Sequence, residues 1–362
     1  MFFNVLDFGA RRDGIVDDAP AVQAAFDQAA LWGGTVVLPP GFYRWASPVV
    51  ATFAAGPMGN GGDGRLLCHG ATILVETPGD PFVALSVVNA ARFTVEGGRF
   101  YGTLDEQNPT RQPAPLSGVI HGGDLAVRDC DFNGFILDRP GNTGALESGN
   151  AVLKGTALSV ERCFFGACGG GGQPIVLAEN YVELAVRGCW FPDFYHLHGT
   201  MMAPASGNYP AAAIAARAPH PDTGRSQLAG ASFVVEDCHL DEGVGGFYGI
   251  AIDRTGSGKH IPFVSIRRLT QAVVPYVGSR GVSIYGAGHV TIEDWFVRQG
   301  HNGSVALMAD HCDSITVART RTDPLSPVTA VAVSPTVGRV RIADSHLDRS
   351  SIKAGQLVDL DS

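Results

Sequence analysis

An eight-residue pattern recurs nine times along the sequence. Apolar residues fill its first and third places, and often its sixth and eighth. The copies stand at 93–100, 125–132, 158–165, 184–191, 233–240, 264–271, 290–297, 315–322 and 340–347. Because the pattern returns every 25 to 49 residues, it predicts stacked coils rather than a compact globule.

The alternation inside each octet predicts two short strands that meet at a corner. In one copy Leu125 and Val127 point inward from the first strand, and Asp129 takes the corner. Cys130 and Phe132 point inward from the second strand. A third strand precedes each following octet, at 151–154, 175–178, 249–253, 281–285 and 304–308 among others. Three parallel strands per coil predict an all-β, right-handed parallel β-helix of about ten coils.

Residues 17–34 predict an α-helix that caps the N-terminal end of the coils. Asp17 or Asp18 is suited to the helix N-cap, and Gly33 and Gly34 to its end. The apolar residues at helical spacing are Val22, Ala25, Phe26 and Ala29. We therefore expect one β-helix domain over 1–362, with the cap and first strands in 1–45, the coils in 46–350 and the C-terminal end in 351–362.

The segment Asn4–Arg44 resembles the N-terminal motif of the pectate-lyase-like superfamily. The matching positions are Asp7-Phe8-Gly9-Ala10, Asp13-Gly14, Asp17-Asp18, Gln23, Gly33-Gly34, Pro39, Gly41 and Tyr43. That superfamily includes polygalacturonases, pectate lyases, uronan epimerases and phage tailspike depolymerases. The resemblance implies a right-handed parallel β-helix with a substrate groove beside the third strand. Through its tailspike-like members it also implies a homotrimer.

Charge and hydropathy exclude several classes of partner. Asp and Glu number 35 against 26 Lys and Arg, which gives a net charge of −9. This balance argues against nucleic acid and against anionic membranes as partners. No apolar run reaches the ~18 residues of a membrane span. The start at Met1–Asn4 lacks the features of a signal peptide, which indicates a cytoplasmic or phage-associated protein, or an exported one whose leader has been removed.

The connections between an octet and the next third strand are long in the first half of the chain. They comprise 101–121, 133–149 and 192–210. Long loops on one face of a repeat protein usually wall a binding surface, so we expect the site beside the third strands between about residues 130 and 290. The inward residues of these strands are expected to align as Leu153, Leu177, Ile214, Ile252, Ile284 and Leu307.

Carboxylates near this face are the catalytic candidates. Glycoside hydrolysis needs one protonated and one ionised carboxyl group. Outward residues on neighbouring coils lie ~5 Å apart, and those two coils apart ~10 Å. Asp253 with Asp241 or Glu242 is the first pair, and Glu179 is the third carboxylate.

Aromatic, basic and loop residues complete the expected site. Trp190, Tyr248 and Tyr285 are suited to stacking on sugar rings, whereas Arg217 and Arg254 are suited to binding a sugar carboxylate. The loops add Asp193, His196 and His198. We expect no metal here, since two loop histidines lack a third ligand.

Two further ladders are interpreted as structural. Cys130, Cys163, Cys189 and Cys238 share the sixth octet place and are expected to be buried free thiols. The corner residues Asp129, Asp237, Asp294 and Asp344 are expected to cap the turns by accepting backbone N–H bonds.

These features favour a carbohydrate-active enzyme that cleaves a polysaccharide or oligosaccharide, with glycoside hydrolysis as the leading hypothesis. A polysaccharide lyase or a uronan epimerase is the first alternative. A tailspike-like glycan-binding protein with little or no catalysis is the second. The clustered calcium-binding acids of pectate lyases are not found, nor are the Asn-x-Asp, Asp-Asp and Gly-His-Gly set of polygalacturonases. No cofactor is expected, and Ca²⁺ belongs only to the lyase alternative.

Overall fold

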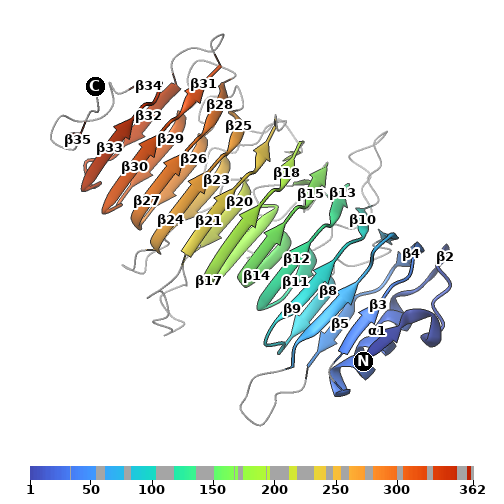
Figure 1. Ribbon diagram of the computed structural model, residues 1–362. Coiled ribbons are helices and arrows are strands. Elements are labelled where there is room, and N and C mark those ends of the chain that lie inside the picture. The colour runs from blue at the N-terminus through green and yellow to red at the C-terminus, as the bar shows by residue number, and fades with distance from the viewer. Residues whose placement is uncertain are drawn as a thin grey trace, which may run out of the picture. The chain divides into compact units, whose positions relative to one another are not determined.

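The chain forms two compact units, Met1–Val176 and Leu177–Ser362. The computed structural model (Figure 1) describes residues 1–32, 34–53, 62–76, 83–102, 118–135, 151–166, 168–169, 174–192, 194–195, 212–217, 232–241, 248–253, 261–273, 280–299, 305–323, 329–348 and 357–359. No helix in these ranges is long and apolar enough to cross a membrane.

The first unit is built of short strands with one α-helix near its start. Its elements are β1 (Phe2–Asn4), a 3-10 helix (Val5–Phe8), β2 (Asp13–Asp17), α1 (Ala19–Trp32), β3 (Gly34–Val37), β4 (Gly41–Trp45), β5 (Val49–Thr52), β6 (Gly64–Leu67), β7 (Ala71–Val75), β8 (Val83–Val88), β9 (Phe93–Glu96), β10 (Arg99–Gly102), β11 (Gly118–His121), β12 (Asp124–Arg128), β13 (Asp131–Asn133), β14 (Ala151–Glu161), β15 (Phe164–Gly166) and β16 (Cys168–Gly169).

These strands stack in three parallel ladders. The first ladder runs β1, β3, β6, β9, β12 and the second half of β14. The second runs β2, β4, β7, β10, β13 and β15. The third runs β5, β8, β11 and the first half of β14. Each coil therefore contributes one strand to each ladder, as the octet and its preceding strand predict.

The second unit repeats this construction. Its elements are β17 (Val176–Arg187), β18 (Trp190–Phe191), β19 (Phe194–Tyr195), β20 (Ala212–Arg217), β21 (Ser232–Glu236), β22 (His239–Leu240), β23 (Tyr248–Asp253), β24 (Ile261–Arg267), β25 (Thr270–Val273), β26 (Arg280–Tyr285), β27 (Ala287–Glu293), β28 (Phe296–Gln299), β29 (Val305–Asp310), β30 (Ser314–Ala318), β31 (Arg321–Thr322), β32 (Thr329–Val333), β33 (Arg339–Ala343), β34 (Leu347–Asp348) and β35 (Leu357–Asp359).

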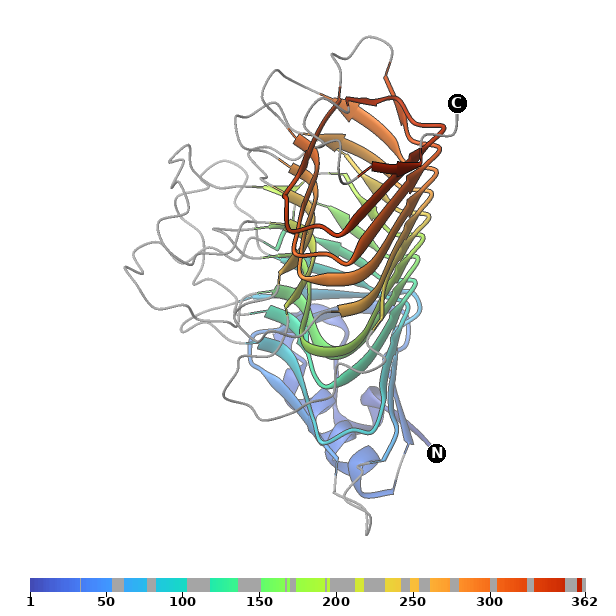
Figure 2. The same cartoon turned by 90° about the vertical axis from the view of Figure 1, so that its left-hand side faces the viewer.

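Its three ladders are also parallel. The first runs β17, β21, β24, β27, β30, β33 and β35. The second runs β18, β22, β25, β28 and β31. The third runs β20, β23, β26, β29, β32 and β34. In Figure 2 the bends between strands of this unit, drawn in yellow to red, lie one above the next. The predicted parallel β-helix architecture is confirmed.

Helix α1 closes the N-terminal end of the first unit, as predicted. The Asp18 carbonyl accepts hydrogen bonds from the N–H groups of Ala21 and Val22, and the Asp17 carboxylate accepts one from Ala19. The apolar stripe Val22, Ala25, Phe26 and Ala29 is buried. The Phe26 ring packs against Phe93, with their centroids 5.8 Å apart. The helix is therefore anchored in the core of the first coils.

Stacked side chains fill the interior of the coils. The inward octet residues Leu125, Val127, Cys130 and Phe132 are all buried, as expected. The Phe132 ring stacks between Phe100 and Phe165, with centroids 5.1 and 5.2 Å away. All seven cysteines are buried and free, and burial raises the pKa of the Cys168 thiol to about 12. The thiols thus act as small apolar groups.

The octet corner corrects one prediction. Its residue has a positive φ in both units, at Gly97, Asp129, Arg162, Gly188, Asp237, Arg268, Asp294, Arg319 and Asp344. The carboxylates of Asp129, Asp237 and Asp294 do not cap the turn. Each accepts two hydrogen bonds from an arginine at the same corner of the next coil, namely Arg162, Arg268 and Arg319. These bonds lower the pKa of each aspartate.

The positive φ at this corner predicts how a substitution there changes the stability of the fold. Gly188 has φ 60°, where a β-branched side chain meets the following carbonyl oxygen. Gly188→Val should therefore destabilise the fold by about 1–2 kcal/mol. Gly188→Asn should cost much less, because asparagine adopts this conformation more readily. Urea unfolding of both variants measures the difference, and equal stability of the two would contradict the steric account.

Candidate functional site

A row of polar positions crosses the carboxyl ends of the third-ladder strands in the second unit. Arg217 at the end of β20 is the register partner of Asp253 at the end of β23, and Tyr285 on β26 is the partner of Asp310 on β29. Since Ile252 pairs with Ile284, Asp253 and Tyr285 occupy the next, equivalent positions. We call Arg217, Asp253, Tyr285 and Asp310, together with His311 next to Asp310, the third-ladder row.

The row differs from the predicted alignment by two residues at two strands. Ile214 pairs with Ile250 rather than Ile252, and Ile284 pairs with Ala309 rather than Leu307. Because side chains alternate with a period of two, a two-residue shift leaves the same residues facing inward. Hydrophobic alternation therefore does not distinguish the two registers. The observed register places Arg217 beside Asp253.

Tyr285, Asp310 and His311 form the described centre of this row. The Tyr285 ring, 37% exposed, packs on the His311 ring with centroids 4.9 Å apart. His311 Nδ1 lies 2.8 Å from Asp310 Oδ1. The Thr336 hydroxyl donates a hydrogen bond to the same carboxylate oxygen, and the backbone N–H of His311 donates one to Thr336 Oγ1 over 3.0 Å.

The electrostatics of Asp310 favour its ionised form. Partial burial pushes its pKa upward, but hydrogen bonds from Thr336 and Ser334 and the charge of His311 outweigh burial. Its pKa is therefore lower than that of an ordinary aspartate. The ionised Asp310 carboxylate therefore lies beside the His311 imidazole. The row thus combines a phenol, an imidazole and a carboxylate, which are the parts of a proton-transfer site.

A second polar row lies on the third ladder of the first unit. His121 on β11 is flanked in register by Ser86 on β8 and Lys154 on β14. The His121 ring nitrogen Nε2 is 2.9 Å from the Ala151 carbonyl oxygen. Burial lowers the pKa of His121 to about 4, and the Lys154 charge adds to this effect. The imidazole is therefore neutral at pH 7.

Sequence reasoning missed His121. The signal was present, because 118–121 precedes the octet at 125 by the same seven residues that separate 151–154 from the octet at 158. Aligning these two segments pairs His121 with Lys154, which is the observed register.

Trp190 and Asp241 lie on a different ladder from Tyr285. Trp190 on β18 is 48% exposed, and its Nε1–H donates to Asp241 Oδ2 over 2.7 Å. Asp241 follows β22 and also forms an ion pair with Arg298 on β28. Both partners of Asp241 belong to the second ladder, whereas Asp253 ends a third-ladder strand. Asp253 and Asp241, which were predicted as a catalytic pair, therefore lie beside different ladders.

The structure does not describe the remaining predicted site residues in full. Asp193, His196, His198, Glu242 and Arg254 lie outside the described residues. For Glu179, Arg217, Tyr248 and Asp253 only the backbone position is described. Their catalytic or binding roles stay predictions.

Within the described ranges, no three His, Cys, Asp or Glu side chains gather in an arrangement that fits a metal ion.

Comparison with known proteins supports the resemblance of the N-terminal segment. Residues 2–74 match the family described as rhamnogalacturonase A/epimerase, pectate lyase-like. The chain is 37% identical over 142 residues to mannuronan C5-epimerase AlgE4 of Azotobacter vinelandii, covering 36% of this chain and 24% of that protein. It is 47% identical over 74 residues to mannuronan C5-epimerase AlgE3 of the same organism, covering 20% of this chain and 4% of that protein. The chain thus spans a quarter or less of these relatives.

A solved structure supports the fold. The tailspike protein of Escherichia coli bacteriophage HK620, in complex with a pentasaccharide, is similar with a TM-score of 0.50 and 13% identity. The match covers 94% of this chain and 65% of the tailspike chain. At this identity the likeness concerns the architecture alone.

The low pKa of His121 in the folded chain predicts how the stability of the fold depends on pH. In the folded chain the pKa is about 4, below the ordinary 6.5. Between these values the unfolded chain binds a proton that the folded chain does not, so stability is full above about pH 6.5 and falls as the pH drops toward 4. His121→Gln should remove this contribution. Urea unfolding between pH 7 and pH 4 tests it, and parallel pH curves for wild type and variant would contradict the assignment.

Proposed function

We propose that this protein acts on an acidic polysaccharide, a uronan, and that its reaction begins with removal of the proton next to the sugar carboxylate. C5-epimerisation is the outcome we favour. The observation that carries the proposal is the third-ladder row, where Tyr285 packs on His311 and His311 is paired with Asp310. Similarity to mannuronan C5-epimerases over part of the chain supports the same substrate class.

The chemistry requires a base, an acid and a cation. A base removes H5, the negative charge moves into the uronate carboxylate, and a cation at that carboxylate stabilises it. Tyr285 and His311 supply groups that accept and donate protons. Arg217, whose backbone lies at the end of β20 in register with Asp253, is of a residue type suited to pairing with carboxylates. The Asp310 carboxylate lies 2.8 Å from His311 Nδ1.

Epimerisation and elimination diverge after this step. If a proton returns to the opposite face of C5, the sugar is inverted and the chain stays whole. If the bond between C4 and the glycosidic oxygen breaks instead, a lyase product with an unsaturated uronate forms. Both outcomes use the same base and the same carboxylate partner. The proposal therefore treats lyase activity as the nearest alternative.

Hydrolysis fits the described row less well. It needs one carboxyl group that stays protonated near neutral pH. In the described part of the row the carboxyl group is Asp310, whose pKa is lowered. Asp241, the other described candidate acid, is bound to Arg298 and Trp190. The hydrolase hypothesis thus rests on Asp253, Glu179 and Glu242.

Replacement of one hydroxyl tests the proposal. Tyr285→Phe should lower the rate on polymannuronate by roughly 10²–10⁴-fold, the usual contribution of general acid–base catalysis, while leaving the fold intact. Tyr101→Phe is the matched control, because Tyr101 lies on β10, a second-ladder strand of the first unit, and not on a third-ladder strand. Nuclear magnetic resonance reports guluronate formed, and ultraviolet absorbance reports unsaturated uronate.

The products separate the alternatives. Guluronate without new chain ends supports epimerisation, and unsaturated uronate supports the lyase outcome. New reducing ends without absorbance would overturn the proposal in favour of hydrolysis. Full activity in Tyr285→Phe would exclude the assigned role of this tyrosine. No change of polymannuronate at all would contradict the proposed activity and favour a glycan-binding protein.

A further inference from the structure

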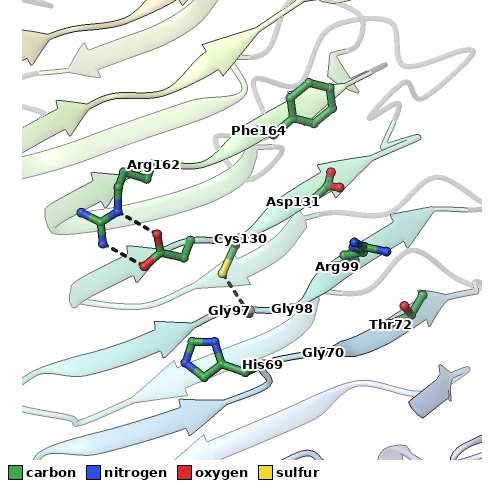
Figure 3. Close-up of a pocket in the computed structure, with 11 residues that line it drawn as sticks. His69, Gly70, Thr72, Gly97, Gly98, Arg99, Cys130, Asp131, Arg162 and Phe164 are labelled. Atoms are coloured by element: carbon green, nitrogen blue, oxygen red, sulfur yellow. Dashed lines mark hydrogen bonds and ion pairs between the residues drawn. The ribbon is translucent and has the colours of Figure 1, made fainter. Parts of the chain in front are cut away.

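A pocket opens on the second ladder of the first unit, on strands outside the third ladder. Its volume is about 540 Å³, within the range of about 300–1,000 Å³ typical of small-molecule sites. One side is a register row of outward residues from four successive coils, Thr72, Arg99, Asp131 and Phe164. Figure 3 shows Arg99, Asp131 and Phe164 pointing away from the strands on the same side.

Two glycines line the pocket at the octet corner. Gly97 and Gly98 have φ of 72° and 98°, a conformation that side chains rarely adopt. A Cβ on Gly97 would lie 2.4 Å from Nδ1 of His69, which also lines the pocket, and one on Gly98 would lie 2.9 Å from the sulfur of the buried Cys68. A side chain at Gly97 would therefore collide with the wall of the pocket, and one at Gly98 with the core beneath it.

The charged side chains that line the pocket differ in whether they have hydrogen-bond or ion-pair partners. At the corner, Asp129 and Arg162 neutralise each other through two hydrogen bonds of 2.7 and 2.8 Å. Asp131 differs, because its Oδ1 is buried without a hydrogen-bond partner among the described residues. Burial raises the pKa of Asp131, and the charge of Arg99 opposes this shift. Arg99 is exposed and forms no ion pair within the described part of the chain.

We propose that this pocket is a saccharide-binding site for a uronate residue of an acidic glycan. Arg99 pairs with the sugar carboxylate, the half-buried Asp131 carboxylate accepts a hydrogen bond from a sugar hydroxyl, and the Phe164 ring lies against the apolar face of the sugar. The site binds without chemistry and goes beyond the reaction proposed for the third-ladder row.

The combination of groups selects this ligand class. A small inorganic anion would satisfy Arg99 but would leave the Asp131 oxygen unpartnered and beside a like charge, which is unfavourable. A neutral sugar would satisfy Asp131 but would offer no carboxylate to the exposed Arg99. A uronate carries both a carboxylate and hydroxyl donors on one ring. It therefore satisfies both groups at once.

Local protection from hydrogen exchange tests the proposal on the full chain. The background is Tyr285→Phe, which should slow turnover, and the probes are a mannuronate hexamer, a guluronate hexamer and neutral cellohexaose. At least one uronate hexamer should protect β10 and β13, whereas cellohexaose should not. Absence of protection on these two strands by both uronate hexamers would overturn the proposal.

Two substitutions assign the protection to named groups. Arg99→Gln and Asp131→Asn should each weaken binding of the uronate hexamer at β10 and β13 about tenfold or more, since the first removes the ion pair and the second removes the charge of the acceptor. Arg321→Gln, at an exposed outward position of the second ladder in the second unit, is the matched control and should bind like the parent. Unchanged affinity in both pocket variants would overturn the proposal. Because Arg99 is exposed, its variant keeps the test valid even if Asp131→Asn unfolds.

Failure of this site and failure of the proposed reaction give different results. If β10 and β13 stay unprotected while the wild type converts polymannuronate, the pocket proposal alone is wrong. If these strands are protected and the wild type leaves polymannuronate unchanged, the reaction proposal alone is wrong.

Discussion

In-register stacking of parallel strands is the constraint on which the rest of the structure depends. Each residue lies beside the residue at the same place in the next coil, about 4.8 Å away. The residue type at one octet place therefore determines the side-chain contacts between successive coils at that place. Inward places stack Phe100, Phe132 and Phe165, and the corner place pairs aspartates with arginines of the following coil. Outward places create the polar rows and the pocket in the same way.

Much of this architecture was predictable from the sequence. The octets, the strands before them and α1 are local patterns and appear close to where predicted, except that Leu347–Asp348 at the end of the last octet pairs with β32 of the third ladder. Register between coils was harder, because inward residues such as Ile250 and Ile252 are equally apolar and a two-residue shift preserves burial. The partners of the corner acids were missed for a related reason. Arg162 and Arg268 come 33 and 31 residues after Asp129 and Asp237, beyond any local turn motif.

The site was predicted less well than the fold. Tyr285 was correctly placed on the outward face of a third-ladder strand, and Arg217 with Asp253 at strand ends. His311 was missed because it follows a strand in a short turn, where sequence alone gives no orientation. Asp241 was chosen as a candidate acid among the loop residues beside the third strands, and its ion pair with Arg298, 57 positions later, could not be read from a local pattern. Chemistry in a stacked fold is set by such cross-coil neighbours.

The central claim is that the third-ladder row transfers the proton at C5 of a uronate. Incubation of polymannuronate with the protein in D₂O tests it most directly, because a proton removed at C5 is replaced by deuterium from solvent. The account predicts deuterium at C5 of inverted residues in intact chains, and loss of this exchange in Tyr285→Phe. Chain cleavage with no deuterium at C5 and no unsaturated uronate would contradict it.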